Sequence, residues 1–308
     1  MRISSATAFE TSVANLQRRQ QALSESQIQL TSGKRVLKAS DDPAAAAQAE
    51  RAMAAVSRAD AQERALQASR NAMQLGESAL GDAGELLQQA RELVVQAGNG
   101  GYTDSERQTL AAALRGLRQD LLAVANRGDG AGRYIFGGQG SAGPAMLDTP
   151  AGVVFNGAAG QLQAASGEAS PLSIDGRAAW LGAADPANAA STLSVFAALD
   201  QTIDELETPG RTSAQVAQTV SQGLAGIDAV AANLASWRSR AGEALNRIDG
   251  ISSRLSQTKL QAQTERSQAE DLDMVQALSD FQNRQTGYDA ALKTYSMVQR
   301  MSLFDYLK

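Results

Sequence analysis

The sequence contains one glycine motif with the spacing of a dinucleotide-binding site, Gly138-Gln139-Gly140-Ser141-Ala142-Gly143. In such a site the glycines let the backbone approach a pyrophosphate, which binds at the N-terminus of the helix that follows. A strand-like segment, residues 133–136, precedes the motif, but Pro144 follows it directly and Pro150 comes soon after. Because these prolines leave no helix N-terminus for the phosphates, the sequence favours a turn between domains over a nucleotide site.

Two acidic groups contain side chains that could bind a divalent cation or exchange protons with a substrate. Asp41 and Asp42 stand without a third acid beside them, and Pro43 follows. This order predicts the start of a helix, with an aspartate cap and proline at the first helical position. The second group is spaced like the solvated face of a helix and not like a metal cage. Its members are Asp200, Asp204, Glu205 and Glu207.

A serine nucleophile is the remaining catalytic possibility, because Ser32 lies two residues from Lys34. A serine–lysine pair needs a buried, desolvated lysine, whereas Lys34 falls in a predicted exposed turn. The chain has no histidine and no cysteine, which removes the common neutral-pH proton shuttle, thiol nucleophiles, disulfides and the usual zinc ligands. We therefore expect no enzyme activity, no cofactor and no metal.

Charge and hydropathy exclude two further classes of partner. The formal net charge is -5 and the pI is about 5.0, and no stretch forms a sustained basic stripe, so we expect no nucleic-acid binding. No window of some 18 apolar residues occurs, and the first residues lack the apolar segment of a cleaved signal peptide. We expect neither membrane insertion nor secretion by a cleaved leader.

The composition favours thin helical rods over a wide globular core. Alanine accounts for 59 residues, nearly half of the 43% scored hydrophobic, and aromatic residues make up only 4%. Large side chains that could fill a wide core are therefore scarce. We predict a mainly α fold, an elongated antiparallel helical bundle or coiled coil formed by the N- and C-terminal arms.

Proline placement predicts a small β-rich insert in the middle of the chain. Five of the six prolines lie between Pro144 and Pro209. Within this stretch residues 153–155 precede Asn156-Gly157 and residues 172–174 precede Asp175-Gly176, as strands precede hairpin turns. We expect five parts: an N-terminal helix (1–40), the first part of a helical bundle (41–137), the inserted β-rich domain (138–190), the second part of the bundle (191–250) and a C-terminal helix (251–308) that returns to the terminal coiled coil.

Two middle helices are indicated by leucine spacing, one around residues 75–94 and one around residues 110–124. The break between them falls at Asn99-Gly100-Gly101, and Thr103 with Glu106 has the spacing of a capping box. The sequence thus predicts a helical hairpin against which residues 193–245 pack.

Both ends of the chain carry apolar seams with a seven-residue repeat. At the N-terminus the repeat predicts one amphipathic helix that ends near Gly33. At the C-terminus a helix from about Ile251 to Ser302 would be roughly 75 Å long. Five of the thirteen aromatic residues lie in the last 28 positions, where chains are usually polar. We expect these seams to pack on each other and on further subunits, through Phe9, Val13, Leu16, Leu23, Leu30, Met274, Leu278, Phe281, Tyr288, Leu292, Tyr295, Leu303 and Phe304.

Several segments resemble the bacterial flagellin family, and within it the hook–filament junction proteins. Residues 30–36 (LTSGKRV) and 40–44 (SDDPA) are similar to the N-terminal signature of the family. Residues 1–4 (MRIS), 132–138 (GRYIFGG) and 301–307 (MSLFDYL) are similar to the junction proteins. The resemblance covers both arms, whereas the insert matches only in position and β-like texture.

This resemblance implies a structural role in the bacterial flagellum, required for filament attachment, assembly and motility. It implies a ring-like layer of identical subunits between hook and filament, in contact with the other hook–filament junction protein and with flagellin. It also implies an extracellular location, reached unfolded through the flagellar type III channel without a cleaved signal peptide. A cytoplasmic export chaperone would hold the C-terminal segment beforehand.

Two alternatives remain open on the sequence alone. A flagellin-type filament subunit would share the terminal signature. A signalling coiled coil would also use alanine-rich heptads, but it would mirror its apolar registers around a tight central tip and would usually have a membrane span, whereas here the centre is an insert rich in proline and glycine.

Overall fold

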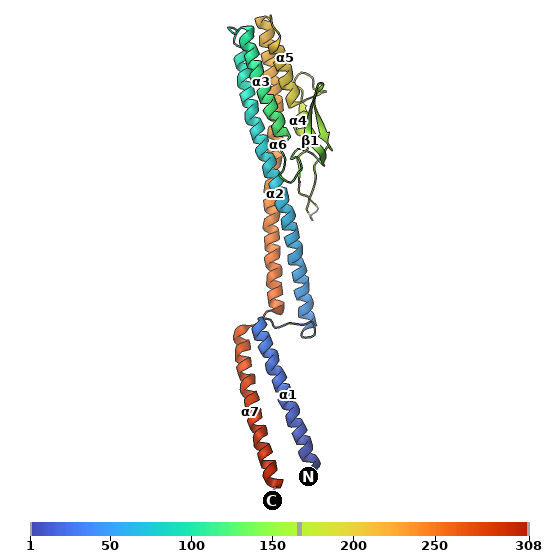
Figure 1. Cartoon of the computed structure of the whole chain (residues 1–308), viewed down its shortest axis with the longest axis vertical. Helices are drawn as coiled ribbons and strands as arrows, with labels where there is room; N and C mark the ends of the chain where they lie inside the picture. The colour runs from blue at the N-terminus through green and yellow to red at the C-terminus, as the bar shows by residue number, and fades with distance from the viewer. Residues whose placement is uncertain (1, 165–167, 307–308) are drawn as a thin grey trace. The chain divides into compact units, whose positions relative to one another are not determined.

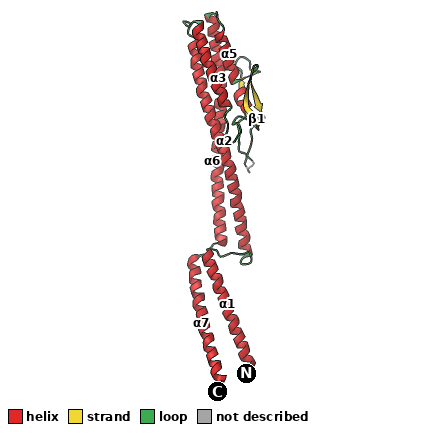
Figure 2. Cartoon of the chain, in the orientation of Figure 1, coloured by secondary structure: helices red, strands yellow, loops and turns green. Residues whose placement is uncertain are grey.

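The computed structural model describes the backbone of residues 2–164 and 168–306. It describes the side chains of residue 7 and of residues 9–164 and 168–297. The structure is mainly helical (Figures 1 and 2). The predicted mainly α fold with a small β insert is confirmed. The chain divides into two compact units. The terminal unit combines residues up to Ala59 with those from Ser256 onward, and the middle unit spans Asp60–Leu255. In order, the helices and strands are α1 (Arg2–Ser32), α2 (Pro43–Ala97), α3 (Asp104–Ala125), β1 (Ser141–Thr149), β2 (Gly152–Gly157), α4 (Gly176–Leu181), β3 (Ala183–Ala184), β4 (Thr192–Leu193), α5 (Val195–Glu207), α6 (Ser213–Glu270) and α7 (Met274–Tyr306).

The main hydrophobic core lies in the middle unit, where parts of α2, α3, α5 and α6 share one cluster of buried side chains. Leucines such as Leu87 and Leu114 fill it, while alanines such as Ala90 and Ala111 are fully buried between helices. Small side chains let helix axes approach closely, so an alanine-rich chain can build a narrow bundle without a wide core.

Helix boundaries follow the predicted caps. Thr103 and Glu106 form a reciprocal capping box at the start of α3. The Ala45 amide donates to Asp42 Oδ1 (3.0 Å) at the start of α2. Gly33 has φ +70° directly after α1, a backbone conformation that glycine adopts without a steric penalty. Local side-chain chemistry therefore decides where these helices begin and end.

The β-rich insert differs from the sequence prediction in both of its expected hairpins. β1 and β2 are antiparallel, but their turn lies at Pro150 and Ala151, so Asn156-Gly157 belongs to β2 and is not the turn. Proline presets the turn backbone and cannot donate to a strand ladder, which favours the turn at that position. The segment 172–174 is not a strand, and Asp175 caps α4 by accepting from the Ala178 amide (3.2 Å).

The insert is fastened to the helices by Arg118 of α3. Its Nη1 and Nη2 donate to the two carboxylate oxygens of Asp148 in β1 (2.6 and 2.9 Å), and its Nε donates to Asp200 of α5 (2.5 Å). The guanidinium also lies 5.8 Å from the ring centroid of Phe196. Asp200 is therefore an ion-pair partner, and not simply a solvated residue as the sequence predicted.

The rest of that acidic group also differs in part from the prediction. Glu205 pairs with Arg211 (3.1 Å) and accepts from the Thr219 hydroxyl (2.6 Å), and Glu207 pairs with Arg115 (2.7 Å). Asp204 is exposed. Arginines of α3 and of the segment after α5 thus bind most of the face that the spacing indicated to be solvated.

The C-terminal helix is not continuous, which corrects the prediction of one helix from 251 to 302. α6 ends at Glu270 and α7 begins at Met274. Asp273 Oδ1 accepts from the amides of Val275 (3.0 Å) and Gln276 (3.1 Å), and so caps α7. The Leu272 amide donates to the Gly33 carbonyl (3.0 Å), and the Arg35 amide donates to the Glu270 carbonyl (2.7 Å). The N-terminal connection thus occupies the backbone groups that a continuous helix would use.

Candidate functional site

The glycine motif is a backbone packing element. Gly138 has φ +65°, and a Cβ there would lie 2.0 Å from the Ala158 carbonyl oxygen. The Gln139 amide donates to that same oxygen (2.8 Å). The last three residues of the motif belong to strand β1, so the motif presents no helix to a phosphate, but it is not simply the turn between domains that the sequence favoured. Residues 133–136, which precede the motif, form a bend and a turn with one isolated bridge at Tyr134, so the prediction of a strand there was wrong.

Substitution of the motif glycines tests this packing role. Gly138→Ala is expected to lower the free energy of unfolding of the middle unit by about 2–3 kcal/mol, because it combines a positive φ with a clash against backbone. Gly143→Ala is the matched control, since its nearest neighbour is the Asn156 amide nitrogen at 3.8 Å, and it should change stability by less than about 0.5 kcal/mol. Urea unfolding followed by tryptophan fluorescence measures both, and equal effects would contradict the packing explanation.

The predicted turn residues near the end of α1 act as caps and pair partners. Asp41 Oδ2 accepts from the amides of Leu37 (3.1 Å) and Lys38 (2.9 Å), which holds the pKa of the Asp41 carboxyl below its ordinary value. Lys34 Nζ pairs with Glu270 (3.1 Å) and is not buried beside Ser32. Among the described residues, no group of three or more acidic side chains is placed to hold a metal ion.

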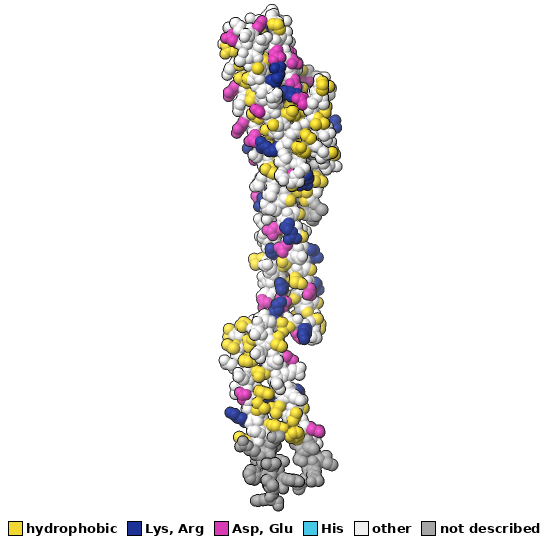
Figure 3. All heavy atoms as spheres, in the orientation of Figure 1, with side chains coloured by type: hydrophobic (Ala, Val, Ile, Leu, Met, Phe, Trp, Pro, Cys, Tyr) yellow, Lys and Arg dark blue, Asp and Glu magenta, His cyan; other side chains and the backbone are white. Residues whose placement is uncertain are grey.

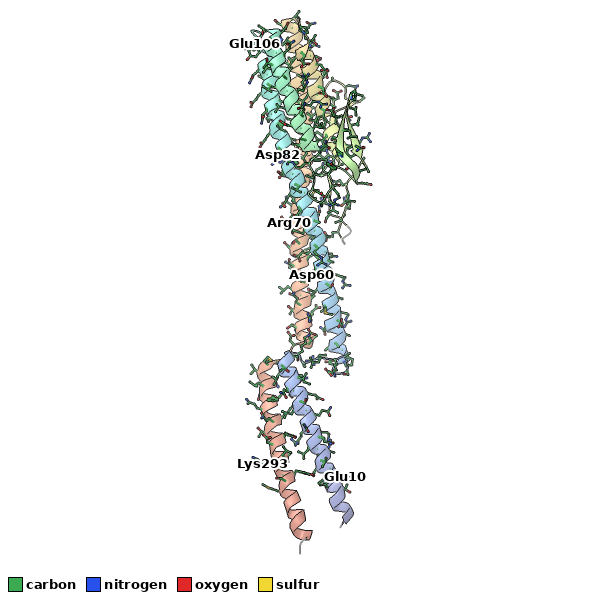
Figure 4. All side chains as sticks on the ribbon, in the orientation of Figure 1. Glu10, Asp60, Arg70, Asp82, Glu106 and Lys293 are labelled. Atoms are coloured by element: carbon green, nitrogen blue, oxygen red, sulfur yellow. The ribbon has the colours of Figure 1, made fainter. Side chains whose placement is uncertain are left out.

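The predicted terminal seam does bring α1 and α7 together in an antiparallel pair (Figure 1). The rings of Phe9 and Tyr295 lie 5.7 Å apart, centroid to centroid. Glu10 of α1 and Lys293 of α7 lie on the same helix pair and are exposed (Figure 4). The predicted seam residues that become half-buried are Val13, Leu16, Leu23, Leu30, Phe281, Tyr288 and Tyr295.

Other predicted seam residues stay exposed. The exposed fractions are 49% for Phe9, 50% for Met274, 52% for Leu278 and 41% for Leu292. Three more apolar side chains that the sequence analysis did not single out are also exposed: Ile28, Val275 and Met297. Hydrophobic side chains accordingly gather on the surface over α1 and α7 (Figure 3). Leu303 and Phe304 belong to α7, but their side chains lie outside the described part of the structure.

Polar contacts across this pair were missed by sequence reasoning. Arg284 Nη1 donates to the Ala22 carbonyl (3.0 Å) and to the Ser26 hydroxyl (2.6 Å). Ser26 is 5% exposed, and it is the only buried side chain among those described in α1 and α7. Ser26 lies three residues after Leu23 and outside the seven-residue repeat, so the sequence offered little signal that this side chain is buried and needs a partner.

Comparisons with known proteins match nearly the whole chain. The bacterial flagellin N-terminal helical region matches residues 3–141, and the bacterial flagellin C-terminal helical region matches residues 224–307. The flagellar hook-associated protein 3 of Escherichia coli (strain K12) is 30% identical over 294 residues, 91% of each chain. The chain belongs to the flagellar hook-associated protein 3 family. The Salmonella typhimurium member (strain LT2) is 29% identical over 315 residues, 99% of each chain.

Solved structures show the same fold at lower identity. The flagellar junction protein FlgL from Legionella pneumophila aligns with a TM-score of 0.61 and 18% identity, over 73% of this chain and 100% of that one. FlgL from Xanthomonas campestris (space group C2) aligns with a TM-score of 0.60 and 21% identity, over 71% of this chain and 99% of that one.

Membership in the hook-associated protein 3 family confirms the resemblance seen in the sequence and assigns the chain a structural role in the bacterial flagellum. It also confirms the expectation that the chain is not an enzyme, because the family is structural. No helix in the described residues has the length and apolar character needed to cross a membrane. The family assignment favours a junction protein over a signalling coiled coil.

Proposed function

We propose that copies of this chain form a ring-like layer between the flagellar hook and the filament. The observation that carries this proposal is the incomplete burial of the terminal seam. α1 and α7 pair through half-buried side chains, yet Met274, Leu278 and Leu292 keep 41–52% of their surface exposed. Apolar area removed from water contributes about 25 cal/mol per Å², so neighbouring subunits that cover these side chains would stabilise the layer.

The interface in this proposal consists of the thirteen predicted seam residues. The half-buried ones hold α1 against α7 together with Phe9, whose ring lies against Tyr295. The exposed Met274, Leu278 and Leu292 meet neighbouring subunits, the other hook–filament junction protein or flagellin. The division of the chain into five parts belongs to the same proposal, with the insert at 138–190 and a C-terminal part at 251–308 that contains the end of α6 followed by α7.

Export belongs to the proposal as well. The chain would pass unfolded through the flagellar type III channel without a cleaved signal peptide and reach the extracellular junction. A chaperone would cover the C-terminal segment until then, since exposed apolar residues such as Val275 (84%) and Met297 (64%) favour aggregation in a free chain. The lack of cysteine is compatible with passage into an oxidising environment.

A strain that lacks this chain tests the proposed role directly. Electron microscopy is expected to show hooks without filaments, and flagellin monomers should appear in the medium, because filament subunits would find no layer on which to polymerise. Complementation with the wild-type gene is the control. Normal filaments on the mutant hooks would contradict a junction role, and absence of any filament protein from the medium would instead indicate that this chain is the filament subunit.

The terminal helices are expected to gain order on assembly, because the pair buries so little side-chain surface in the single chain. Amide hydrogens of α1 and α7 should exchange rapidly in a dilute monomer and slowly in isolated hook–filament junctions. The middle unit, with its buried core, is the internal control and should exchange slowly in both states. Slow exchange of α1 and α7 in the dilute monomer would contradict assembly-coupled ordering.

A further inference from the structure

The apolar seam between α1 and α7 does not by itself define how the two helices align along their length. Leu16, Leu23 and Leu30 recur every seven residues in α1, and Phe281, Tyr288 and Tyr295 recur every seven residues in α7. A slide of one helix by seven residues brings large apolar side chains opposite each other again. Hydrophobic burial therefore favours several registers almost equally, and polar contacts must distinguish them. At one end of the pair the backbone bonds of Gly33 and Arg35 to Leu272 and Glu270 do so.

One such contact joins Arg284 to two acceptors on α1. Its Nη1 lies 3.0 Å from the Ala22 carbonyl oxygen and 2.6 Å from Ser26 Oγ. In an antiparallel pair shifted by seven residues, Arg284 would face residues 15 and 19, or residues 29 and 33. The Ser26 hydroxyl, 5% exposed, would lose this charged donor in either case. A buried hydroxyl without its partner is costly, so the observed register is favoured.

A second contact lies one turn further along the same pair. Arg19 of α1 passes so close to Gly287 of α7 that a Cβ there would lie 2.9 Å from Arg19 Nη1. Gly287 is the only glycine in either helix, although glycine disfavours helical backbone. A shift by seven residues would place Asp280 or Thr294 against Arg19 instead. The Arg284–Ser26 contact fits only the observed alignment, whereas Arg19 would gain an ion pair in the shift that places Asp280 opposite it, so Arg19 does not decide the register.

We infer that Arg284, through Ser26 and the Ala22 carbonyl, selects the register of α1 against α7 within the pair, where it adds to the backbone bonds at Gly33 and Glu270 that hold one end. Arg284 is itself exposed, so its role is to select one alignment and not to supply most of the stability of the pair. The inference depends on the pairing of α1 with α7 and not on the proposed place at the hook–filament junction.

Disulfide trapping in the full chain tests this role, because the chain has no cysteine of its own. The pair Phe9→Cys with Tyr295→Cys reports the observed register, since these two rings are in contact. The pairs Phe9→Cys with Tyr288→Cys and Leu16→Cys with Tyr295→Cys report shifts of seven residues in the two directions. Mild oxidation followed by non-reducing gels and mass spectrometry gives the yield of each disulfide.

With Arg284 in place, the observed-register pair is expected to exceed each shifted pair by more than about tenfold, because the backbone bonds at Gly33 and Glu270 add to the contact of Arg284. Arg284→Met should lower this ratio by roughly tenfold, the factor that one charge-assisted hydrogen bond contributes. Arg18→Met is the matched control and should leave the ratio unchanged, because Arg18 bonds within α1, to Asn15 Oδ1 (2.6 Å) and the Ala14 carbonyl (3.4 Å).

Three results would overturn the inference. The first is an unchanged ratio in Arg284→Met, and the second is an equal yield of all three pairs while Arg284 is present. The third is loss of all three disulfides in Arg284→Met, since Arg284 would then hold the helices together instead of selecting their alignment.

Discussion

Leu278→Asp is expected to abolish filament attachment while the monomer stays folded. Leu278 is 52% exposed in the single chain, so a carboxylate there remains hydrated and disturbs neither the α1–α7 pair nor the middle unit. In an assembled layer the same carboxylate would be buried among apolar side chains, and an unpaired buried charge costs several kcal/mol per subunit. A motility assay and electron microscopy of the mutant strain measure the effect.

Three companion variants make this experiment specific. Ser279→Asp adds the same charge to an exposed, polar position of α7 and should leave filaments attached. Leu16→Asp, at a half-buried position, should also abolish stable junctions, but through loss of α1–α7 pairing. Val154→Asp, on the exposed surface of the insert (44%), should have little effect on attachment. Motile Leu278→Asp cells with normal filaments would refute a role of the exposed seam in assembly.

Arg118→Met is expected to lower the free energy of unfolding of the middle unit by about 2 kcal/mol. It removes three charge-assisted hydrogen bonds that join α3 to β1 and α5. Each such bond can contribute about 1.5–3 kcal/mol, but Asp148 and Asp200 keep 43% and 36% of their side-chain surface in water, so screening reduces the sum. Both tryptophans, Trp180 and Trp237, lie in the middle unit, so fluorescence-detected urea unfolding reports on this unit alone.

The control for Arg118 lies one turn away on the same helix. Arg115 pairs with Glu207, and both side chains are largely solvated (46% and 37% exposed), so Arg115→Met should cost less than about 1 kcal/mol. Equal losses for the two arginines would contradict the fastening role of Arg118.

The same ion pair predicts a pH dependence. Hydrogen bonding to Arg118 lowers the pKa of the Asp148 carboxyl in the folded chain. A carboxyl with a lowered folded-state pKa stabilises the fold above its unfolded pKa, about 4 for aspartate, and this stabilisation is lost as the pH falls through the folded value. The difference in stability between wild type and Asp148→Asn should therefore be full at pH 7 and shrink below pH 4. A difference that stays constant down to pH 3 would contradict the ion pair.

The parts of the fold that sequence reasoning predicted well are those set by neighbouring residues. Thr103 and Glu106 reach each other within one turn, and Asp42 caps the helix that begins at Pro43, so their spacing alone identifies them. Seven-residue repeats likewise identified the two terminal helices. Distant parts of the chain decide none of these features.

The predictions that failed depend on residues far apart in the sequence. The break after Glu270 is stabilised by backbone bonds from Gly33 and Arg35, more than 230 positions away. Asn156 and Gly157 are residue types that favour a hairpin turn, yet they lie in β2. The chain turns at Pro150 and Ala151 instead, and Gly157 pairs with Ser141 of β1. The heptad pattern placed Leu278 in the seam, but Leu278 is exposed, because packing decides which side of α7 meets α1. The contact between Ser26 and Arg284 was also missed, because the sequence does not show which distant residue a serine will contact.

The coincident interruption of the helices at residues 33–42 and 271–273 has a mechanical consequence. A helical backbone resists bending because hydrogen bonds tie each turn to the next. In this chain α1 and α6 both end at this level, and three backbone bonds, from Leu272 to Gly33 and from Arg35 and Val36 to Glu270, join the two segments there. Curvature imposed on the terminal unit would concentrate there and spare the rods on either side.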